Sequence, residues 1–460
     1  MANLKPSIPK GTRDFSPEVV AKRNFIFDTM RAVFTKFGFQ PIETPAMENL
    51  ETLTGKYGDE GDQLIFKILN SGDFLAKADP EKLQAGDSRR LTPEIAEKAL
   101  RYDLTVPFAR YVVMHQHEIT FPFKRFQIQP VWRADRPQKG RYREFYQCDA
   151  DIVGSESLLN EAEFILIYDE VLSRLGLKEF TIRVNNRKIL SGIAELTGKP
   201  DKMMDLTIAI DKLDKIGIGG VEKELLQRGF EEADLDKIKP FLNLGGTNPE
   251  KIRHLKESLA SSETGLKGIE ELETVFTYLS RFNTNRAVVE LDITLARGLN
   301  YYTGAILEVR SDEVKMGSIG GGGRYDDLTG MFGMNGLTGV GISFGADRIY
   351  DVMEELKLFP PRTTLGTTLL ITNFDRETEM FALDLLQTLR HHHVAVELYP
   401  SPVKLQKQFK YADARNIPYV LVIGPEELQS GQLTLKHMKS GEQEKITAEA
   451  LPSVFSAPSS

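Results

Sequence analysis

Two changes in the periodicity of apolar and polar residues along the chain constrain its fold more than any single motif does. Residues 101–154 consist of short β-like runs, and residues 185–282 are dominated by amphipathic helical segments. β-like runs then return at residues 287–298 and 305–311. Since a period near 3.6 marks a helix and a period of two marks a half-buried strand, this pattern predicts a large mixed-β body interrupted by a helical insertion.

The body begins with a predicted helix, residues 17–37, whose two ends are marked in the sequence. Ser16 can cap the helix, and Gly38 is suited to end it. Pro41 and Pro45 follow closely. Because proline has no backbone N–H, we expect this segment to be an edge strand or an extended loop.

A second module follows the Pro360-Pro361 pair. Three strand-like runs alternate with two helical stretches between residues 369 and 424. That β-α-β-α-β order predicts a small α/β domain with a mainly parallel sheet. Residues 451–460 are rich in serine and proline, and we expect them to form a loose tail.

Composition narrows the class of protein. The 460 residues include 58 Lys and Arg against 66 Asp and Glu, and the net charge of −8 excludes a generally basic coat for nucleic acid. The single cysteine, Cys148, excludes an internal disulfide and is expected to be a buried structural thiol. The chain has no apolar run of about 18 residues and no secretory signal at its start, so we expect a cytoplasmic protein without a membrane span.

The densest charge feature is residues 124–143, with seven basic residues, one acidic residue and a net charge of +6. A solvated loop and an anion site both explain it. Arginine predominates, and its planar guanidinium suits phosphate. Pro137 and Gly140 predict a turn, which would let Arg133 face Arg141 across a hairpin and clamp a polyphosphate.

Further polar residues could complete such a site. Arg348 lies in the first turn of a predicted helix, and Arg297 lies near Tyr301 and Tyr302, whose rings are typical of small-molecule pockets. Taken alone, Arg348 is better explained as a surface arginine, and ordinary core or edge tyrosines explain Tyr301 and Tyr302 equally well. The glycine run at residues 317–328 lacks the Gly-Lys-Ser/Thr of a phosphate loop, and we interpret it as a tight turn that lets a ligand approach.

Metal-protease and serine-hydrolase motifs do not occur in the sequence. The three consecutive histidines at residues 391–393 cannot all face one ion from a helix or a strand, so we interpret them as a solvated helix end. No protein-bound metal centre is therefore expected.

Five segments stand in the order found in one family, and the chain resembles histidyl-tRNA synthetase, a class II aminoacyl-tRNA synthetase. Residues 38–48 (GFQPIETPAME), 126–154 and 339–353 (GVGISFGADRIYDVM) are similar to motifs 1, 2 and 3 of that class. Residues 100–111 (LRYDLTVPFARY) and 296–309 (ARGLNYYTGAILEV) are similar to the two signatures of the histidine enzyme. The resemblance covers nearly the whole chain.

The resemblance implies a domain plan. An α+β catalytic domain on a mainly antiparallel sheet would occupy residues 1–184 and 283–358, with a helical insertion at residues 185–282. An α/β anticodon-binding domain would occupy residues 365–450, and residues 451–460 would form the tail. Motif 1 lies at the dimer interface in the family, so a homodimer is implied as well.

The resemblance also implies an activity. L-Histidine would be activated with ATP to histidyl-adenylate, with release of pyrophosphate, and then transferred to the 3′ end of the tRNA for histidine. This chemistry explains why no serine or cysteine nucleophile is found, because the histidine carboxylate itself attacks the α-phosphate. What it requires is positioning and neutralisation of charge by arginines and Mg²⁺.

The implied residue roles fall into overlapping groups. The residues implied for histidine binding are Asp103, Leu104, Thr105, Arg133, Gln147, Asp151, Arg297, Tyr301 and Tyr302. The residues implied for ATP binding are Arg133, Asp135, Arg141, Phe145 and Arg348. Arg133 and Arg297 are implied to be catalytic, and Asp151 with Tyr302 would bind the imidazole nitrogens. Asn300 departs from an aspartate common in the family, which removes a charge beside the imidazole pocket.

Two alternatives compete with this interpretation. A non-catalytic, synthetase-like regulatory subunit of histidine biosynthesis typically lacks the anticodon module and loses aminoacylation residues, whereas both occur here. A class II enzyme for another amino acid is disfavoured by the paired tyrosines. Without the resemblance, the residues predict only a phosphate-binding, nucleotide-dependent enzyme.

Overall fold

The structure is a computed structural model, and it describes residues 5–455 except 57, 139, 297–301, 327 and 365. Three residues discussed above, Arg297, Asn300 and Tyr301, therefore lie outside the described residues. The chain divides into two compact units, residues 1–359 and 360–460, which are described separately. Within the described ranges, no helix combines the length and the apolar character that crossing a bilayer requires.

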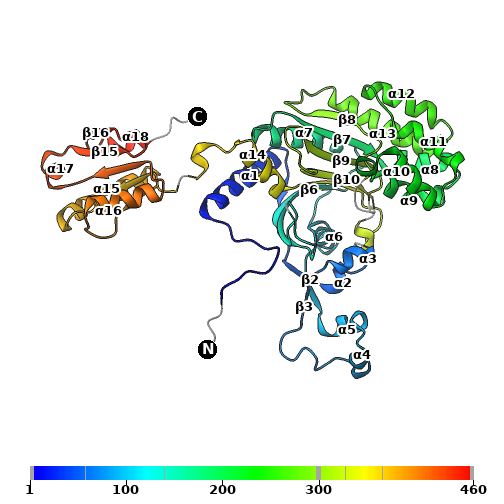
Figure 1. The fold of residues 1–460 in the computed structure, drawn as a ribbon, viewed down its shortest axis with the longest axis horizontal. Helices are drawn as coiled ribbons and strands as arrows, with labels where there is room; N and C mark the ends of the chain where they lie inside the picture. The colour runs from blue at the N-terminus through cyan, green and yellow to red at the C-terminus, as the bar shows by residue number, and fades with distance from the viewer. Residues whose placement is uncertain are drawn as a thin grey trace. The chain divides into compact units, whose positions relative to one another are not determined.

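A large sheet forms the centre of the first unit (Figure 1). Its strands are β1 (Gln40–Pro41), β5 (Phe123–Trp132), β6 (Glu144–Val153), β7 (Phe180–Asn186), β8 (Val288–Leu291), β9 (Ala305–Ser311), β10 (Gly320–Tyr325) and β11 (Gly339–Phe344). The strand order is β1-β5-β6-β11-β10-β9-β7-β8. Only the outermost pairs, β1 with β5 and β7 with β8, are parallel, so the predicted mainly antiparallel sheet is confirmed.

The N-terminal helix lies on this sheet as part of a helical layer. The layer consists of α1 (Pro17–Lys36), α7 (Leu159–Arg174) and α14 (Ala346–Glu355). Ser16 accepts a hydrogen bond from the backbone N–H of Val19, and Gly38 adopts a φ of 82° just after the helix, as predicted. The Pro41 strand lies at the edge of the sheet, where its missing N–H costs no ladder hydrogen bond.

Alternation along β6 separates the core from the opposite face of the sheet. Cys148, Ala150 and Ile152 are fully buried in the same hydrophobic cluster as α1 and α7. Burial raises the pKa of the Cys148 thiol well above its ordinary value, which fits the structural role predicted for it. The residues between them point to the other face, where the cavities described below lie.

The helical segment predicted between the β-like runs is present. It comprises α8 (Arg187–Leu196), η1 (Pro200–Lys202), α9 (Met203–Ile210), α10 (Leu213–Gln227), α11 (Glu232–Leu242), α12 (Asn248–Ser258) and α13 (Glu263–Leu279). α8 and α13 pack closely, because a Cβ at Gly192 would lie 2.7 Å from the Cα of Gly265. Apolar residues of these helices join the cluster under the large sheet, and the division of this unit at residues 185 and 282 stays a prediction.

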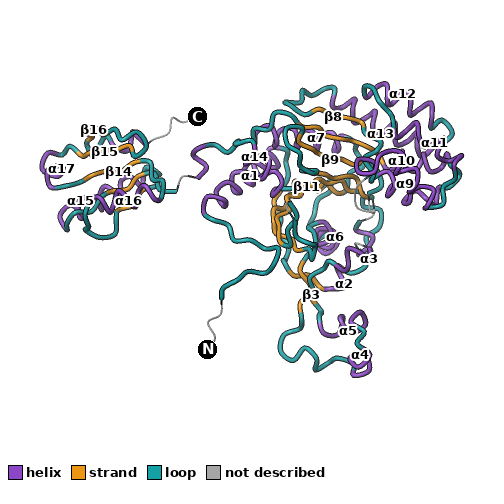
Figure 2. The backbone as a smooth tube through the Cα atoms, viewed as in Figure 1, coloured by secondary structure: helices purple, strands orange, loops and turns teal. Residues whose placement is uncertain are grey.

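A small three-stranded sheet, not resolved in the sequence analysis, adjoins the large one. Its order is β2-β4-β3, formed by β2 (Met47–Asn49), β3 (Lys67–Ile68) and β4 (Lys98–Leu100). The neighbouring helices are α2 (Leu50–Leu53), α3 (Gly58–Gln63), α4 (Pro80–Ala85), α5 (Ser88–Ile95), α6 (Thr105–Met114) and η2 (Thr329–Phe332). Figure 2 shows α4 and α5 standing apart from the body of this unit.

The second unit contains a mixed sheet. Its strands are β12 (Leu369–Ile371), β13 (Val396–Leu398), β14 (Tyr419–Val422), β15 (Leu433–His437) and β16 (Gln443–Ile446), in the order β13-β12-β14-β15-β16. Its helices are η3 (Pro361–Thr364), α15 (Arg376–His391), α16 (Leu405–Ala414), α17 (Pro425–Ser430) and α18 (Leu451–Phe455). The first three strands are parallel as predicted, but β15 and β16 add an antiparallel hairpin.

The predicted tail is wrong at its start. Residues 451–455 form α18, and Leu451 is fully buried in the core of the second unit. The serine and proline content led to the wrong prediction, because Pro452 is itself buried and the ring of Phe455 packs against Tyr419. Residues 456–460 lie outside the described residues.

Candidate active site

The basic segment forms the hairpin loop that the sequence predicted. The backbone N–H of Arg133 donates to the carbonyl of Arg143 at 2.9 Å, and Gln138 pairs with Arg141 nearer the tip. Gly140 has a φ of 72°, which suits glycine at the turn. The loop is held from outside by the N-terminal segment, because the N–H of Arg143 donates to the carbonyl of Gly11 at 2.9 Å.

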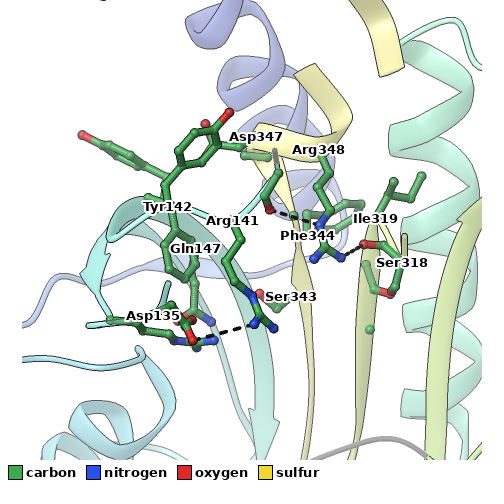
Figure 3. Close-up of a pocket in the computed structure, with 18 residues that line it drawn as sticks. Asp135, Arg141, Tyr142, Gln147, Ser318, Ile319, Ser343, Phe344, Asp347 and Arg348 are labelled. Carbon is green, nitrogen blue, oxygen red and sulfur yellow. Dashed lines mark hydrogen bonds and ion pairs between the residues drawn. The ribbon is translucent and has the colours of Figure 1, made fainter. Parts of the chain in front are cut away.

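A cavity of about 270 Å³ lies between this hairpin and the start of α14 (Figure 3). All five residues predicted to bind ATP line it, namely Arg133, Asp135, Arg141, Phe145 and Arg348. Gln147, Ser318, Ser343 and Asp347 also contribute to the wall. Three guanidinium groups around one cavity fit a polyanionic ligand.

Two of these arginines reach the cavity from different elements, Arg141 from the hairpin loop and Arg348 from α14. Arg348 donates from Nη1 to the carbonyl oxygen of Ser318 at 2.6 Å, and Arg141 lies 3.8 Å from Asp135 (Figure 3). Asp347, beside Arg348, accepts hydrogen bonds from Arg13 and Arg23 at 2.8 and 2.5 Å. The N-terminal segment and α1 thereby anchor the start of α14.

A smaller cavity of about 100 Å³ adjoins the first. Its wall includes the predicted residues Asp103, Thr105, Arg133, Gln147, Asp151 and Tyr302. Four residues, Arg133, Gln147, Gly321 and Ser343, line both cavities. Arg133 can therefore contact a ligand group in each cavity at the point where the cavities adjoin.

One predicted contact is not brought to the site. The side chain of Leu104 is fully buried and, among the described residues, is absent from the walls of both cavities. Leu104 precedes α6, so its side chain turns into the core while its neighbours Asp103 and Thr105 reach the smaller cavity. The roles predicted for Arg297 and Tyr301 fall on residues outside the described ranges.

Asp151 is fixed at the base of the smaller cavity by two partners. Its Oδ2 lies 2.7 Å from Nη2 of Arg125, and its Oδ1 accepts a hydrogen bond from the hydroxyl of Tyr325 at 2.7 Å. Burial raises the pKa of Asp151, while Arg125 and the Tyr325 hydrogen bond act in the opposite direction. Arg125 itself is fully buried and lies over the ring of Phe108 at 4.0 Å.

Asp149 lies on the same face of β6, between Gln147 and Asp151. It is almost completely buried, and burial raises its pKa to about 7, with Arg125 opposing the shift and Asp151 adding to it. Gln147 donates from Nε2 toward both carboxylate oxygens of Asp149, each at 3.4 Å. Nothing in the sequence analysis had singled out this residue.

The glycine run is a strand and not the predicted tight turn. Gly320–Tyr325 form β10 in the middle of the sheet, and Gly321 lines both cavities. A Cβ at Gly322 would lie 2.1 Å from the carbonyl oxygen of Gly341, so the strands pass too closely for a side chain. The prediction that a ligand could approach this backbone closely agrees with Gly321 in the cavity walls.

Sequence reasoning missed three polar residues of the smaller cavity region, Arg125, Asp149 and Tyr325. A usable signal was present, since Gln147, Asp149 and Asp151 alternate along one predicted strand and must share a face. Arg125 was counted only as part of the basic segment, although its register partner on β6 is Asp151.

Comparisons with known proteins agree with this geometry. Residues 87–349 match the family model described as histidyl-tRNA synthetase, and residues 367–457 match the model described as anticodon binding domain. The chain is 61% identical to the histidine–tRNA ligase of Christiangramia forsetii over 97% of this chain and 98% of that protein.

Solved structures give the same result. A histidyl-tRNA synthetase from Nostoc sp. aligns over 98% of this chain and 99% of its own, with a TM-score of 0.83 and 32% identity. A Bacillus halodurans structure named ATP phosphoribosyltransferase regulatory subunit/histidyl-tRNA synthetase covers 88% of this chain and 97% of its own, with a TM-score of 0.72 and 22% identity. At that identity, the second likeness shows the fold alone.

Proposed function

The chain belongs to the histidyl-tRNA synthetase family, and on this premise we propose that its adjoining cavities form histidyl-adenylate, with ATP in the larger and histidine in the smaller cavity. The enzyme is an aminoacyl-tRNA synthetase that ligates histidine to tRNA, and ATP is its second substrate. The observation that carries the assignment of the cavities is their shared wall at Arg133 and Gln147.

In this scheme the histidine carboxylate attacks the α-phosphate of ATP at the junction of the cavities, and pyrophosphate leaves toward Arg141 and Arg348. Arg133 stands at the junction and can donate to both the carboxylate and the α-phosphate, which neutralises the charge that develops there. Its Nε donates to the carbonyl of Tyr102 at 3.0 Å, so the guanidinium is oriented before substrate arrives. Phe145 offers its ring to the adenine.

Recognition of the imidazole ring rests on Asp151 and Tyr302. A carboxylate accepts from a ring N–H, and a phenol hydroxyl can donate to or accept from the other nitrogen. Asp103 and Gln147 supply acceptors for the α-ammonium group. A buried site of this kind rejects analogues without ring nitrogens, because its polar groups would be left unpaired.

Mg²⁺ fits this site as an ion carried by the ATP phosphates. Among the described residues, no three His, Cys, Asp or Glu side chains cluster as a protein cage would require. Mg²⁺ commonly uses one or two carboxylates together with substrate phosphates, however, and Asp135 lines the larger cavity with only a long 3.8 Å pairing to Arg141. Asp135 would hold the ion, which would supply positive charge to the phosphates.

The second unit is the counterpart of the anticodon-binding model, and we propose that α16 faces the tRNA. Lys404, Lys407 and Lys410 are exposed along this helix and its N-cap. Arg415 is already engaged by Glu397 and Tyr411, so the lysines are the better candidates for phosphate contacts. Base identity would have to come from stacking and edge contacts elsewhere on the unit.

Assembly and location complete the proposal. A homodimer would form through the segment similar to motif 1, which lies at the edge of the large sheet as β1 and leaves Met47 exposed. We also propose a cytoplasmic location, which the use of tRNA and ATP as substrates supports. Arg297 and Tyr301 keep the roles implied by the resemblance, at the carboxylate and in the histidine pocket.

The regulatory-subunit alternative is not favoured. Relatives named histidine–tRNA ligase are 61% and 57% identical over 97% of this chain, and the anticodon-binding module is present. The fold shared with a regulatory-type structure does not distinguish the two functions.

Histidine-dependent ATP–pyrophosphate exchange tests the proposal. The wild-type protein should catalyse exchange with histidine and with none of the other 19 amino acids. Arg133→Ala should lose at least about 100-fold in kcat/KM, as removal of a transition-state charge partner typically does. Arg174→Ala, which removes an exposed surface arginine on α7, is the matched control and should retain full activity. Exchange that survives in Arg133→Ala would overturn the assignment of the junction.

A further inference from the structure

Three side chains alternate along β6 and reach the smaller cavity together: Gln147, Asp149 and Asp151. The first and the last have substrate roles in the proposed function, and the middle one does not. Asp149 is 3% exposed, so its carboxyl group is buried. The proposed function gives it no contact with substrate, which leaves an effect on neighbouring side chains as its role. A buried carboxyl group is costly to ionise, which makes such a residue worth explaining.

The contacts of Asp149 fix the side chain of Gln147. Both oxygens of Asp149 accept from Nε2 of Gln147 at 3.4 Å, while Oε1 of Gln147 accepts from Nη2 of Arg133 at 3.4 Å. An ionised carboxylate can only accept hydrogen bonds, so it selects the orientation in which the amide NH₂ points toward Asp149. The carbonyl oxygen of Gln147 is thereby presented at the junction of the two cavities. The hydroxyl of Ser343 provides a further hydrogen bond to Asp149.

The charge balance of the smaller cavity also indicates a role for Asp149. The titratable and charged groups around Asp149 are Asp103, Arg125, Arg133, Asp151, Tyr302 and Tyr325. With Asp149 ionised, three carboxylates face two guanidinium groups, which leaves a net charge of about −1 before substrate binds. The α-ammonium group of an amino acid supplies the missing positive charge.

We propose that Asp149 is a positioning residue of the histidine subsite, which orients the Gln147 amide and compensates the charge of the substrate α-ammonium group. The proposal rests on the proposed function, since it assumes that histidine occupies the smaller cavity. Burial raises the pKa of Asp149 to about 7 in the substrate-free protein, so the group is partly protonated at neutral pH. An incoming ammonium group favours the ionised form, and binding should therefore strengthen as the pH rises through 7.

Asp149→Asn tests the proposal in the full-length enzyme. In ATP–pyrophosphate exchange, we expect KM for histidine to rise at least about tenfold, because a charge-assisted interaction is lost, while KM for ATP changes less than about twofold. Glu308→Gln alters another buried carboxylate of the same sheet, one that pairs with Arg310, and should change neither constant. An equal rise of both KM values in Asp149→Asn would indicate a merely structural role and overturn the proposal.

Two inhibitors identify the part of the substrate that Asp149 serves. Histidinol keeps the α-amino group, whereas imidazole-propionate lacks it. We expect Asp149→Asn to weaken inhibition by histidinol about as much as it raises KM for histidine, and to leave inhibition by imidazole-propionate within about twofold. Equal effects on both inhibitors would contradict the proposal.

Ser343→Ala provides a test that does not depend on a change at Asp149. This variant removes a hydrogen bond to the ionised carboxylate but keeps its charge, so KM for histidine should fall at a higher pH than in the wild type. An unchanged pH profile would overturn the proposal. If the wild type shows no exchange with histidine, the proposed function fails, which is a different outcome from an active wild type whose variants behave normally.

Discussion

Arg125 and Asp151 form an ion pair in the interior of the protein, with Nη2 and Oδ2 2.7 Å apart and both side chains at most 5% exposed. They are register partners on β5 and β6, so the hairpin that carries the arginine-rich loop also contributes Asp151 to the wall of the smaller cavity, where we propose that histidine binds. Arg125 opposes the effect of burial on the pKa of Asp151 and fixes the direction of its carboxylate, which is what acceptance of a hydrogen bond from an imidazole N–H requires.

Removal of Arg125 should therefore destabilise the protein by more than removal of the whole pair. Arg125→Met leaves Asp151 buried without its charge partner, which costs about 3–5 kcal/mol in comparable pairs. The double variant Arg125→Met/Asp151→Asn should recover most of that loss, yet still fail to bind histidine. Urea unfolding of the two variants measures the difference, and equal stabilities would argue against a tightly coupled pair.

The closeness of β11 to Asp151 makes Gly341 a specific probe. A Cβ at this position would lie 2.0 Å from Oδ1 of Asp151, so Gly341→Ala must displace the carboxylate. We expect KM for histidine to rise at least about tenfold, with ATP binding retained. Gly219→Ala, on α10 with open space around the new methyl group, is the matched control and should leave both constants unchanged. Equal loss of ATP and histidine binding would point to collapse of the sheet.

Arg348→Lys should separate charge from geometry in the larger cavity. The guanidinium of Arg348 donates to the carbonyl of Ser318 and projects into the cavity, whereas a lysine ammonium cannot make a planar, forked contact with phosphate. KM for ATP should rise by about tenfold while KM for histidine stays within twofold, as measured by exchange kinetics. A rise confined to histidine would show that the two cavities have been assigned the wrong way round.

Asp149 should also make stability depend on pH in the substrate-free protein. Its pKa of about 7 lies above the ordinary 3.8, so the folded state binds more protons than the unfolded state between these values. The contribution of Asp149 to stability is therefore present below about pH 4 and is lost as the pH rises toward 7, at about 1.4 kcal/mol per pKa unit. Asp149→Asn should gain urea resistance relative to the wild type between pH 5 and pH 8. If the urea midpoints of the variant and the wild type differ by the same amount at every pH in this range, the raised pKa of Asp149 is contradicted.

Much of the fold, and the gathering of Arg133, Arg141 and Arg348 around the larger cavity, could be predicted because the signals were local. Ser16, Gly38 and the alternation on β6 are signals that lie within or beside one element, so no distant contact is needed to interpret them. The arginine content of the loop is by itself typical of an anion site. The resemblance to a known family implied roles for residues far apart in the chain, and these roles stay predictions.

What the sequence did not show depends on contacts between distant strands. The hydroxyl of Tyr325 meets Asp151 across 174 residues, and neither residue alone suggests the pair. A run of glycines is typical of a turn, which is why β10 was predicted as one. The structure shows that glycine is required at Gly322 because strand β11 passes too closely for a side chain. The hairpin of β15 and β16 was missed because its strands are short and mostly polar.

The most direct test of the account is the affinity of a non-hydrolysable histidyl-adenylate analogue, measured by calorimetry. If the two cavities meet at Arg133, the analogue should bind at least about 100-fold more tightly than histidine or AMP alone, and Arg133→Ala should abolish that advantage. The corresponding phenylalanyl analogue, whose ring has no nitrogen atoms, should bind at least about 100-fold more weakly. An analogue that binds no better than AMP, or equal affinity for the phenylalanyl compound, would contradict a joined site that selects histidine.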